Sequence, residues 1–525
     1  MSRRRIMEID RSITSADLSP ATKRVFELAG GKARLIARTW DASRGTPVFT
    51  VAGKYTARGW TEWTQGFQYG CPILTFDATG EQDLLALGRQ NTLRFMAPHV
   101  THTGVHDHGF NNLSTYGNLR RLMLEGKIAH DDWELAFYEM ALKSSGAVQA
   151  ARWTSVAGGG GYVYSFNGPH SLFIDTMRTI RILGLAHQLG HVLMGENDAR
   201  ISLLERAVQH ALTTARFIVF KGDSGHTYDI RGRTAHEGIF NTNDGNFRCR
   251  STQQGYSPFS TWTRGLAWAM LGFAEQLELF VTIGPKGFES GCGMSYDEVM
   301  KTCRQAAEAT CDHYINDCSA SDGSVYWDDG APGLAKMPGW RERPADPFNE
   351  HEPVDSSAAA IAAQGLLRLG RFLNSAFSAS PGTPGEGRGE GLAERLNDSN
   401  KTPPRTNPHP NPLPEYRERG RSASDALEKA GDIYTCAGLT IARTIFSDSY
   451  LSQAPEHQGL LLHSVYHRPN NWDHIPPGRK VPCGESSMWG DYLAIELALL
   501  IHRLAEDGPY YKFFDDAPRE KPSGA

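Results

Sequence analysis

Helical periodicity is the feature that most limits the folds open to this chain. Apolar residues recur every three or four positions over about eleven segments, which is the spacing of one face of an α-helix. The expected helices span 16–41, 81–97, 112–125, 130–145, 171–195, 199–220, 262–281, 296–315, 355–374, 425–446 and 487–506. Strand patterns are few and short, as at 324–327. The pattern therefore predicts an all-α protein.

The segments between the expected helices are rich in Gly, Trp, Tyr, His and Asp. They span 59–77, 101–111, 153–170, 223–261, 321–354 and 464–487. Helical hairpins joined by such loops favour a toroid in which the loops at one end line a central cavity. The alternative is a superhelix of short repeats, but the sequence has no fixed period of about 30–45 residues.

One segment, 375–424, differs in composition from the rest of the chain. Pro, Gly, Ser, Asn and Arg dominate it, and apolar residues are sparse. Such a run buries too little surface to offset the entropy lost on ordering. We expect a low-complexity, disordered insertion between two helices, with a binding arm as the alternative. The last residues, 515–525, are expected to form a flexible tail.

Charge and cysteine content exclude several classes of protein. The net charge is −5, from 54 basic and 59 acidic residues, so no nucleic-acid partner is expected. The eight cysteines form no CxxC pair and match neither a zinc site nor a disulfide scaffold. No apolar run has the length of a signal peptide or a membrane helix, so no membrane partner is expected. A cytoplasmic location follows, or a periplasmic one if the start site is mis-assigned.

The first candidate for chemistry is Asp107, in the sequence HDHGF just before an expected helix. A carboxylate in this position often caps the helix, because it meets unpaired N–H groups and the positive end of the helix dipole. Asp107 could instead act on a ligand. The nearby His102, His106 and His108 suggest zinc, but their spacing is not that of a helical HExxH site, and no metal is predicted.

The second candidate is Asp175, which lies inside the apolar run SLFIDTM. Burying a carboxylate is costly unless it is paired. One explanation is a structural ion pair with Arg178, one turn onward. The other is a carboxyl group whose apolar setting raises its pKa, so that it can act as an acid.

The third candidate is the segment that holds Gln254, Arg264 and Trp268. Arg264 is placed at a helix start, which is unfavourable for a cation, so its guanidinium is predicted to bind an anion. Trp268 lies one turn onward and either packs in the helix bundle or stacks on a sugar ring. Several Trp-bearing loops in a helical toroid favour a carbohydrate ligand.

Taken together, these motifs resemble the unsaturated glucuronyl hydrolases, glycoside hydrolase family 88. The resemblance runs from about position 60 to about 504, interrupted by 375–424. The stretches that carry it are WTEWTQGFQYG, HDHGF, SLFIDTM, the GHTYD stretch, QQGYSPFSTWTRGLAWAMLGFAE, DGSVYWDD, DSSAAAIAAQGLLRL and CGESSMWGDY.

The resemblance implies a single (α/α)6 barrel over 1–525 with a deep central pocket. It implies removal of the 4,5-unsaturated uronic acid that polysaccharide lyases leave at a non-reducing end. In this reaction an acid protonates C4 of the vinyl ether and water adds at C5. The hemiketal then opens, and the glycosidic link breaks. No cofactor is implied, and the chain is expected to be a monomer or a weak homo-oligomer.

Site residues follow from the resemblance by position. Asp175 matches the general acid/base, and Asp107 matches a second essential aspartate. The expected substrate-binding residues are Trp63, His226, Gln254, Ser260, Arg264 and Trp268. The chain departs from the family pattern at 71–74 and between His226 and Gln254, which leaves the preferred substrate open. The alternatives are an unsaturated rhamnogalacturonyl hydrolase and a catalytically inactive sugar-binding toroid.

Overall fold

The computed structural model describes residues 7–59, 63–378 and 414–514, with side chains except at 376–378 and 414–428. Most of the expected insertion, the expected tail at 515–525 and residues 60–62 lie outside this description.

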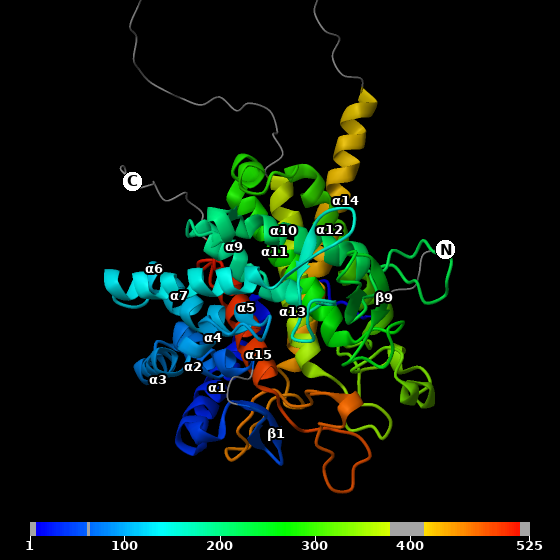
Figure 1. Cartoon of the computed structure of the whole chain (residues 1–525). Coiled ribbons are helices and arrows are strands. Elements are labelled where there is room, and N and C mark those ends of the chain that lie inside the picture. Colours follow the sequence, from blue (N-terminus) through cyan, green and yellow to red (C-terminus); the bar gives the residue numbers. More distant parts are fainter. Residues whose placement is uncertain (1–6, 60–62, 379–413, 515–525) are drawn as a thin grey trace, which may run out of the picture.

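An inner ring of helices forms the centre of the described chain (Figure 1). In ring order its members are α2 (Gln65–Thr79), α5 (His108–Asn112) with α6 (Asn118–Leu124), α8 (Thr176–Thr179) with α9 (Arg181–Gln188), α11 (Thr263–Cys292), α13 (Ser356–Ser378) and α15 (Met488–Ala505). Each member packs against the next, and α15 packs against α2, so the ring closes.

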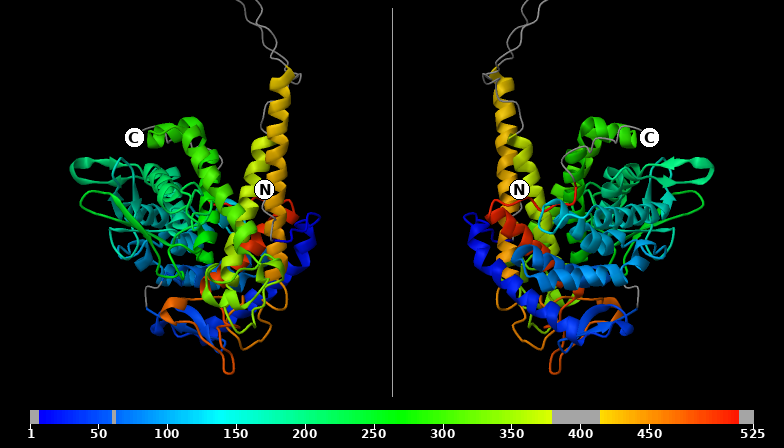
Figure 2. Two further views of the ribbon diagram at one scale, coloured as in Figure 1. Left: turned by 90° about the vertical axis from the view of Figure 1, so that its right-hand side faces the viewer. Right: turned by 90° about the vertical axis from the view of Figure 1, so that its left-hand side faces the viewer.

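A second set of helices covers the outside of this ring. Its members are α1 (Ser19–Thr39), α3 (Gln82–Phe95), α7 (Asp132–Ala151), α10 (Leu203–Phe217), α12 (Tyr296–His313) and α14 (Pro414–Ile445). Each outer helix packs on at least one neighbouring inner helix, and Figure 2 shows α14 running alongside α13 and beyond its end. Six inner and six outer positions in the described chain make the (α/α)6 barrel that the resemblance implies.

The remaining elements are short and lie in the connections. They are α4 (Ala97–Val100), β1 (Pro47–Val51), β2 (Lys54–Ala57), β3 (Trp153–Ser155), β4 (Gly161–Val163), β5 (Ser171–Phe173), β6 (Leu193–Met194), β7 (Arg200–Ile201), β8 (Glu237–Phe240) and β9 (Phe247–Ser251). The largest sheet in the described chain has three antiparallel strands in the order β5-β8-β9. The strand expected at 324–327 makes only isolated bridges.

Three predictions about elements are wrong. The segment 59–77, predicted as a loop, contains the inner helix α2, with Pro72 inside it. The helix predicted over 171–195 is divided into β5, α8, α9 and β6. The insertion was predicted to reach 424, but α13 continues to Ser378 and α14 begins at Pro414. In each case neighbouring segments override the local preference of the sequence.

Helix α11 is long and apolar enough to cross a membrane by length and composition alone. In the structure, 78% of its most apolar window is buried within the protein. It packs against α13 on one side, α8 and α9 on the other, and α12 outside. Its apolar composition therefore reflects its place as an inner helix of the barrel.

A close approach between two inner segments depends on glycine. A Cβ added at Gly109 in α5 would overlap the backbone carbonyl of Thr179 at the end of α8. Backbone cannot move aside as a flexible side chain can, so only glycine lets these two segments come this near. Gly66 in α2 meets the backbone of Asn111 in the same way.

We predict that Gly109→Ala lowers the free energy of unfolding by about 2 kcal/mol, because α5 and α8 must separate to admit the methyl group. The measurement is urea denaturation followed by circular dichroism. Gly31→Ala is the matched control: Gly31 is an exposed helical glycine with open space around it, so alanine should stabilise the protein by about 0.5–1 kcal/mol. Equal effects of the two substitutions would contradict the close-approach argument.

Candidate active site

A cavity of about 650 Å³ opens at the end of the barrel where the inner helices begin. Trp63 precedes α2, Asp107 precedes α5, Asp175 precedes α8, and Arg264 is the second residue of α11. All four side chains line the cavity, together with Gln254 and Trp268. The loops before the inner helices therefore form the cavity wall, as expected for a toroid of hairpins.

Asp107 is buried, with 6% of the residue exposed, yet it does not cap the helix that it precedes. Its carboxylate makes no hydrogen bond to any described residue, and its nearest charged group is the ring of His106, with Nε2 at 3.8 Å from Oδ1. The helix-capping explanation for Asp107 is therefore wrong.

Asp175 is not paired with Arg178. The guanidinium of Arg178 points away and forms ion pairs with Glu275, at 2.7 Å, and with Glu496, at 2.9 Å. The ion-pair explanation for Asp175 is therefore also wrong, and one of its carboxylate oxygens, Oδ1, is buried without a hydrogen-bond partner among the described residues.

His106 joins the two carboxylates. Its Nε2 lies 3.5 Å from Oδ2 of Asp175, and the polar atoms of these three side chains lie within 4.8 Å of one another. The ring itself is buried against Phe173 and Phe166. One imidazole and two carboxylates are also ligand types for a divalent cation, so the arrangement can either move a proton or hold a metal ion.

The two aspartates differ in acidity. Burial raises the pKa of Asp107, and the positive His106 nearby offsets this only in part. Burial also raises the pKa of Asp175, but the hydrogen bond and charge of His106 outweigh it, and the net pKa is lowered. The pKa of His106 is raised, because the two carboxylates outweigh its own burial. The expectation that the apolar setting raises the pKa of Asp175 is therefore wrong for the ligand-free site.

Arg264 is bound to the protein itself. Its Nη1 donates to Oδ2 of Asp355 at 2.7 Å and to the carbonyl of Val465, and its Nη2 donates to the carbonyl of Tyr466 and to Gln254. Both terminal nitrogens thus hold the cavity wall together, and because Arg264 also lines the cavity, its binding of an anionic ligand stays a prediction.

The aromatic residues form a continuous wall. The ring of Trp63 stacks on that of Trp489, with centroids 4.9 Å apart. Phe110 contacts both Trp63 and Trp268, at 5.6 and 4.8 Å. Apolar ring surfaces of this kind suit the apolar faces of a sugar.

Two predicted site residues do not line the cavity. His226 is exposed in the loop before β8 and stacks on Tyr228, at 5.1 Å. Ser260 is buried, but its hydroxyl is engaged in a turn with Ser257. The loop after α10 carries His226 outward, and the turn closes Ser260 into the segment before α11. The substrate-binding role of both residues stays a prediction.

A different histidine, His236, takes a place beside Asp175. The backbone N–H of Ile174 donates to the carbonyl of His236 at 3.0 Å, which extends the pairing of β5 with β8. The His236 ring lies 4.3 Å from the ring of Phe173 and 4.8 Å from that of Trp262, and burial lowers its pKa to about 3, so the ring is neutral near neutral pH. Only the strand pairing reveals this neighbour, so sequence spacing could not identify it.

Several other residues that line the cavity were not predicted from the sequence. They are Arg58, Phe166, Tyr466, His467, Asn470 and Trp472. The guanidinium of Arg58 lies over the rings of Trp472, at 4.8 Å, and Tyr466, at 5.4 Å, and forms no ion pair with a described residue. The aromatic composition of 464–487 pointed to this loop, but Arg58 lies more than 400 positions earlier and carried no such signal.

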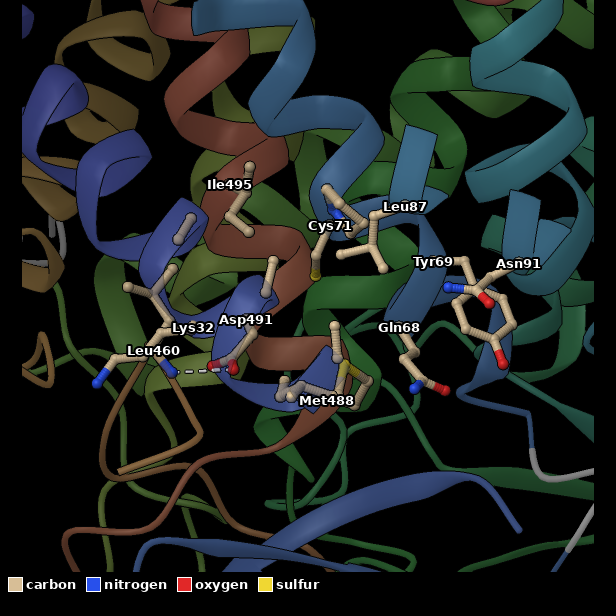
Figure 3. Close-up of a pocket in the computed structure, with 15 residues that line it drawn as sticks. Lys32, Gln68, Tyr69, Cys71, Leu87, Asn91, Leu460, Met488, Asp491 and Ile495 are labelled. Atoms are coloured by element: carbon tan, nitrogen blue, oxygen red, sulfur yellow. Dashed lines mark hydrogen bonds between the residues drawn. The ribbon is translucent and has the colours of Figure 1, made fainter. Parts of the chain in front are cut away.

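A second, smaller cavity lies between α1, α2 and α15 (Figure 3). Its volume is about 40 Å³, room for very few water molecules. Lys32 donates to the carbonyls of Ala454 and His457, and Asp491 accepts from Tyr55 and the N–H of Leu460. The charged groups at this cavity are thus already bound, and it is too small for a sugar.

The closed double ring and its acidic, aromatic-lined cavity define an (α/α)6-barrel protein with a pocket of sugar size. No family model matches the chain. Its sequence is 26% identical over 339 residues to the unsaturated glucuronyl hydrolase of Bacillus sp. (strain GL1), covering 62% of this chain and 71% of that protein. It is 24% identical over 318 residues to that of Formosa agariphila, covering 60% of this chain and 64% of that protein.

A solved structure adds to this likeness. A crystal structure of an unsaturated glucuronyl hydrolase specific for heparin aligns with a TM-score of 0.61 at 18% identity, covering 93% of this chain and 98% of that chain. The curated relatives confirm the resemblance to the unsaturated glucuronyl hydrolases, and the solved structure confirms the fold.

Proposed function

We propose that this protein is a hydrolase that removes the 4,5-unsaturated uronic acid from the non-reducing end of lyase-generated oligosaccharides. The observation that carries the proposal is the pair Asp107 and Asp175, buried side by side at a cavity of sugar size without the structural partners that would explain their burial. The two curated relatives, both named unsaturated glucuronyl hydrolases, support this choice of reaction for the pair.

In the proposed reaction Asp175 donates a proton to C4 of the C4=C5 double bond, and a water molecule adds at C5. The water gives up its second proton to a carboxylate of the pair, so the site ends with the protons it began with. Asp107, held near by His106, stabilises the positive charge that develops at C5 and the ring oxygen. The hemiketal at C5 then opens, and the second sugar is released from C1.

The substrate is an anion, and Arg58 is the cation we propose for it. Arg264 is already held by Asp355, whereas Arg58 lines the same cavity and forms no ion pair with a described residue. A planar guanidinium held against two aromatic rings suits a carboxylate or a sulfate, because it binds either through two parallel hydrogen bonds.

The function is tested by incubating the protein with unsaturated disaccharides from chondroitin, hyaluronan, heparin, ulvan, gellan and rhamnogalacturonan. The readout is loss of the ultraviolet absorbance of the alkene. Cleavage of rhamnogalacturonan products alone would favour a rhamnogalacturonyl hydrolase, and binding without turnover would favour a sugar-binding toroid. Cleavage of the matching saturated disaccharides would indicate a direct glycosidase. The same assay in the presence of a chelator tests whether a metal ion takes part in the reaction.

We predict that Asp175→Asn lowers kcat by about a thousandfold or more while substrate binding is retained, because the amide keeps the shape of the side chain but cannot donate an acidic proton. The measurements are alkene loss and calorimetric binding of the same disaccharide. An Asp175→Asn variant with near-normal turnover would show that another group supplies the proton.

We predict that His106→Gln moves the alkaline limb of the kcat–pH profile upward by about one pH unit. Asp175 must be protonated to act, and the positive His106 favours its ionised form, so removing that charge raises the pKa of Asp175. His226→Gln is the control, because His226 is exposed outside the cavity and its replacement should leave the profile unchanged. A downward shift in His106→Gln would argue against Asp175 as the acid.

We predict that Arg58→Gln raises KM about tenfold or more with a small change in kcat, since a charge-assisted hydrogen bond to the anion is lost. The KM of Arg58→Lys should lie between those of the wild type and Arg58→Gln, because lysine keeps the positive charge but cannot form two parallel hydrogen bonds. Arg44→Gln, which removes an exposed guanidinium lying 5.1 Å from the ring of Trp40, is the matched control. A defect on sulfated substrates alone assigns Arg58 to a sulfate, a defect on all assigns it to the uronate, and no defect overturns its role.

For location, we propose a reducing compartment such as the cytoplasm. All eight cysteines are free, and six of them are buried. Free thiols of this number are typical of proteins that fold where disulfides do not form.

A further inference from the structure

Helix α7 lies at the outside of the barrel (Figure 1) and carries several exposed apolar side chains. Trp133, Ala136, Phe137 and Met140 follow the spacing of one helical face, and we call them the α7 stripe. Trp133 is 83% exposed and Met140 61%. A fully exposed tryptophan beside other exposed apolar side chains marks an interaction surface more often than a lone exposed residue does.

The α7 stripe borders an open groove of about 750 Å³ between α3 and α7. Leu85, Ala86 and Leu93 line the groove from α3, and Trp133 and Phe137 line it from α7. The surface thus offers a projecting apolar side chain next to a depression, the two complementary parts that a self-associating surface needs.

We propose that a second copy of this chain covers the α7 stripe, with the two α7 helices packed antiparallel about a twofold axis beside Phe137. This axis places position 137 opposite position 136 or 137 of the partner. Because the helices are antiparallel, each step toward the C-terminus of one helix is matched by a step toward the N-terminus of the other. Trp133 then faces the partner's Met140, and the apolar stripe is self-complementary along its whole length.

The charges of α7 support the antiparallel arrangement. Asp132 lies in the first turn, and Lys143 lies eleven positions onward, about 16 Å along the axis. On the same axis the partner's Lys143 lies opposite position 130 or 131, one or two residues and about 1.5–3 Å along the helix from Asp132. Lys143 forms no ion pair with a described residue, whereas Glu134 is bound by Arg89 and Asp132 lies 2.9 Å from Nε2 of the exposed His130. A parallel pair would put like charges opposite each other.

The proposed interface does not depend on the proposed function. None of the residues of the α7 stripe lines the cavity that holds Asp107 and Asp175, so the proposed interface does not include that cavity. A substitution in the α7 stripe can therefore abolish dimerisation without abolishing turnover, and the two properties can be measured separately.

The first test is sedimentation equilibrium over a range of protein concentrations. We expect a reversible dimer in the wild type and at least a tenfold weaker dimer in Trp133→Glu and Met140→Glu, because a carboxylate would be buried in the interface. Val281→Glu is the control, since Val281 is similarly exposed, at 54%, on another helix. A wild type that is monomeric at high concentration overturns the proposal.

Two further variants test the geometry. Phe137→Cys, placed in a Cys249→Ser background because Cys249 is exposed, should give a crosslinked dimer with a short bifunctional thiol reagent, whereas Val281→Cys should not. Asp132→Lys and Lys143→Asp should each weaken the dimer severalfold, and the double variant should restore it. A dimer that neither crosslinks at 137 nor responds to the charge swap is not the one proposed.

Discussion

A buried network of charges closes the barrel, and the site depends on it. Arg178 of α8 pairs with Glu275 of α11 and Glu496 of α15, and Arg181 of α9 reaches the same Glu275. From α13, Arg368 pairs with Glu278 of α11. Members of the ring far apart in sequence are thereby held together by side chains that are almost fully buried. Loss of one partner from such a network typically costs about 3–5 kcal/mol, because the remaining charge is left buried. The network thus fixes which helices are neighbours, and their first residues meet around one cavity.

The same network explains why Asp175 is available for chemistry. Asp175 and Arg178 are one helical turn apart, and in an isolated helix they would pair. The two glutamates on α11 and α15 draw the guanidinium inward, and the carboxylate one turn earlier is left facing the cavity with His106. The close contact of Gly109 with Thr179 brings Asp107 to the same place. Two residues three positions apart thus have different places: Arg178 lies in the buried ion-pair network, and Asp175 lies at the cavity.

Much of the fold and part of the site could be predicted from the sequence, and the failures have physical causes. Helical periodicity found most of the barrel, because amphipathic faces are local in sequence. It missed α2, whose Pro72 and glycines are typical of loops but which is held by packing on both sides. Motif likeness indicated Asp107, Asp175 and Trp63, which do meet at the cavity. His236 and Arg58 were missed, because only strand pairing and loop packing bring them there.

The lowered pKa of Asp175 in the ligand-free site has a consequence for the proposed reaction. His106 favours the ionised form of Asp175, whereas an acid that protonates an alkene must be neutral before it reacts. A bound uronate brings a third negative charge beside Asp107 and Asp175 and displaces water, and both changes favour protonation of the carboxyl group. Asp175 Oδ1 has no hydrogen-bond partner among the described residues, so no hydrogen bond to this oxygen opposes its protonation. In the proposed reaction, substrate binding would thus favour the neutral carboxyl group that donates the proton, and the anion on the sugar would take part in catalysis.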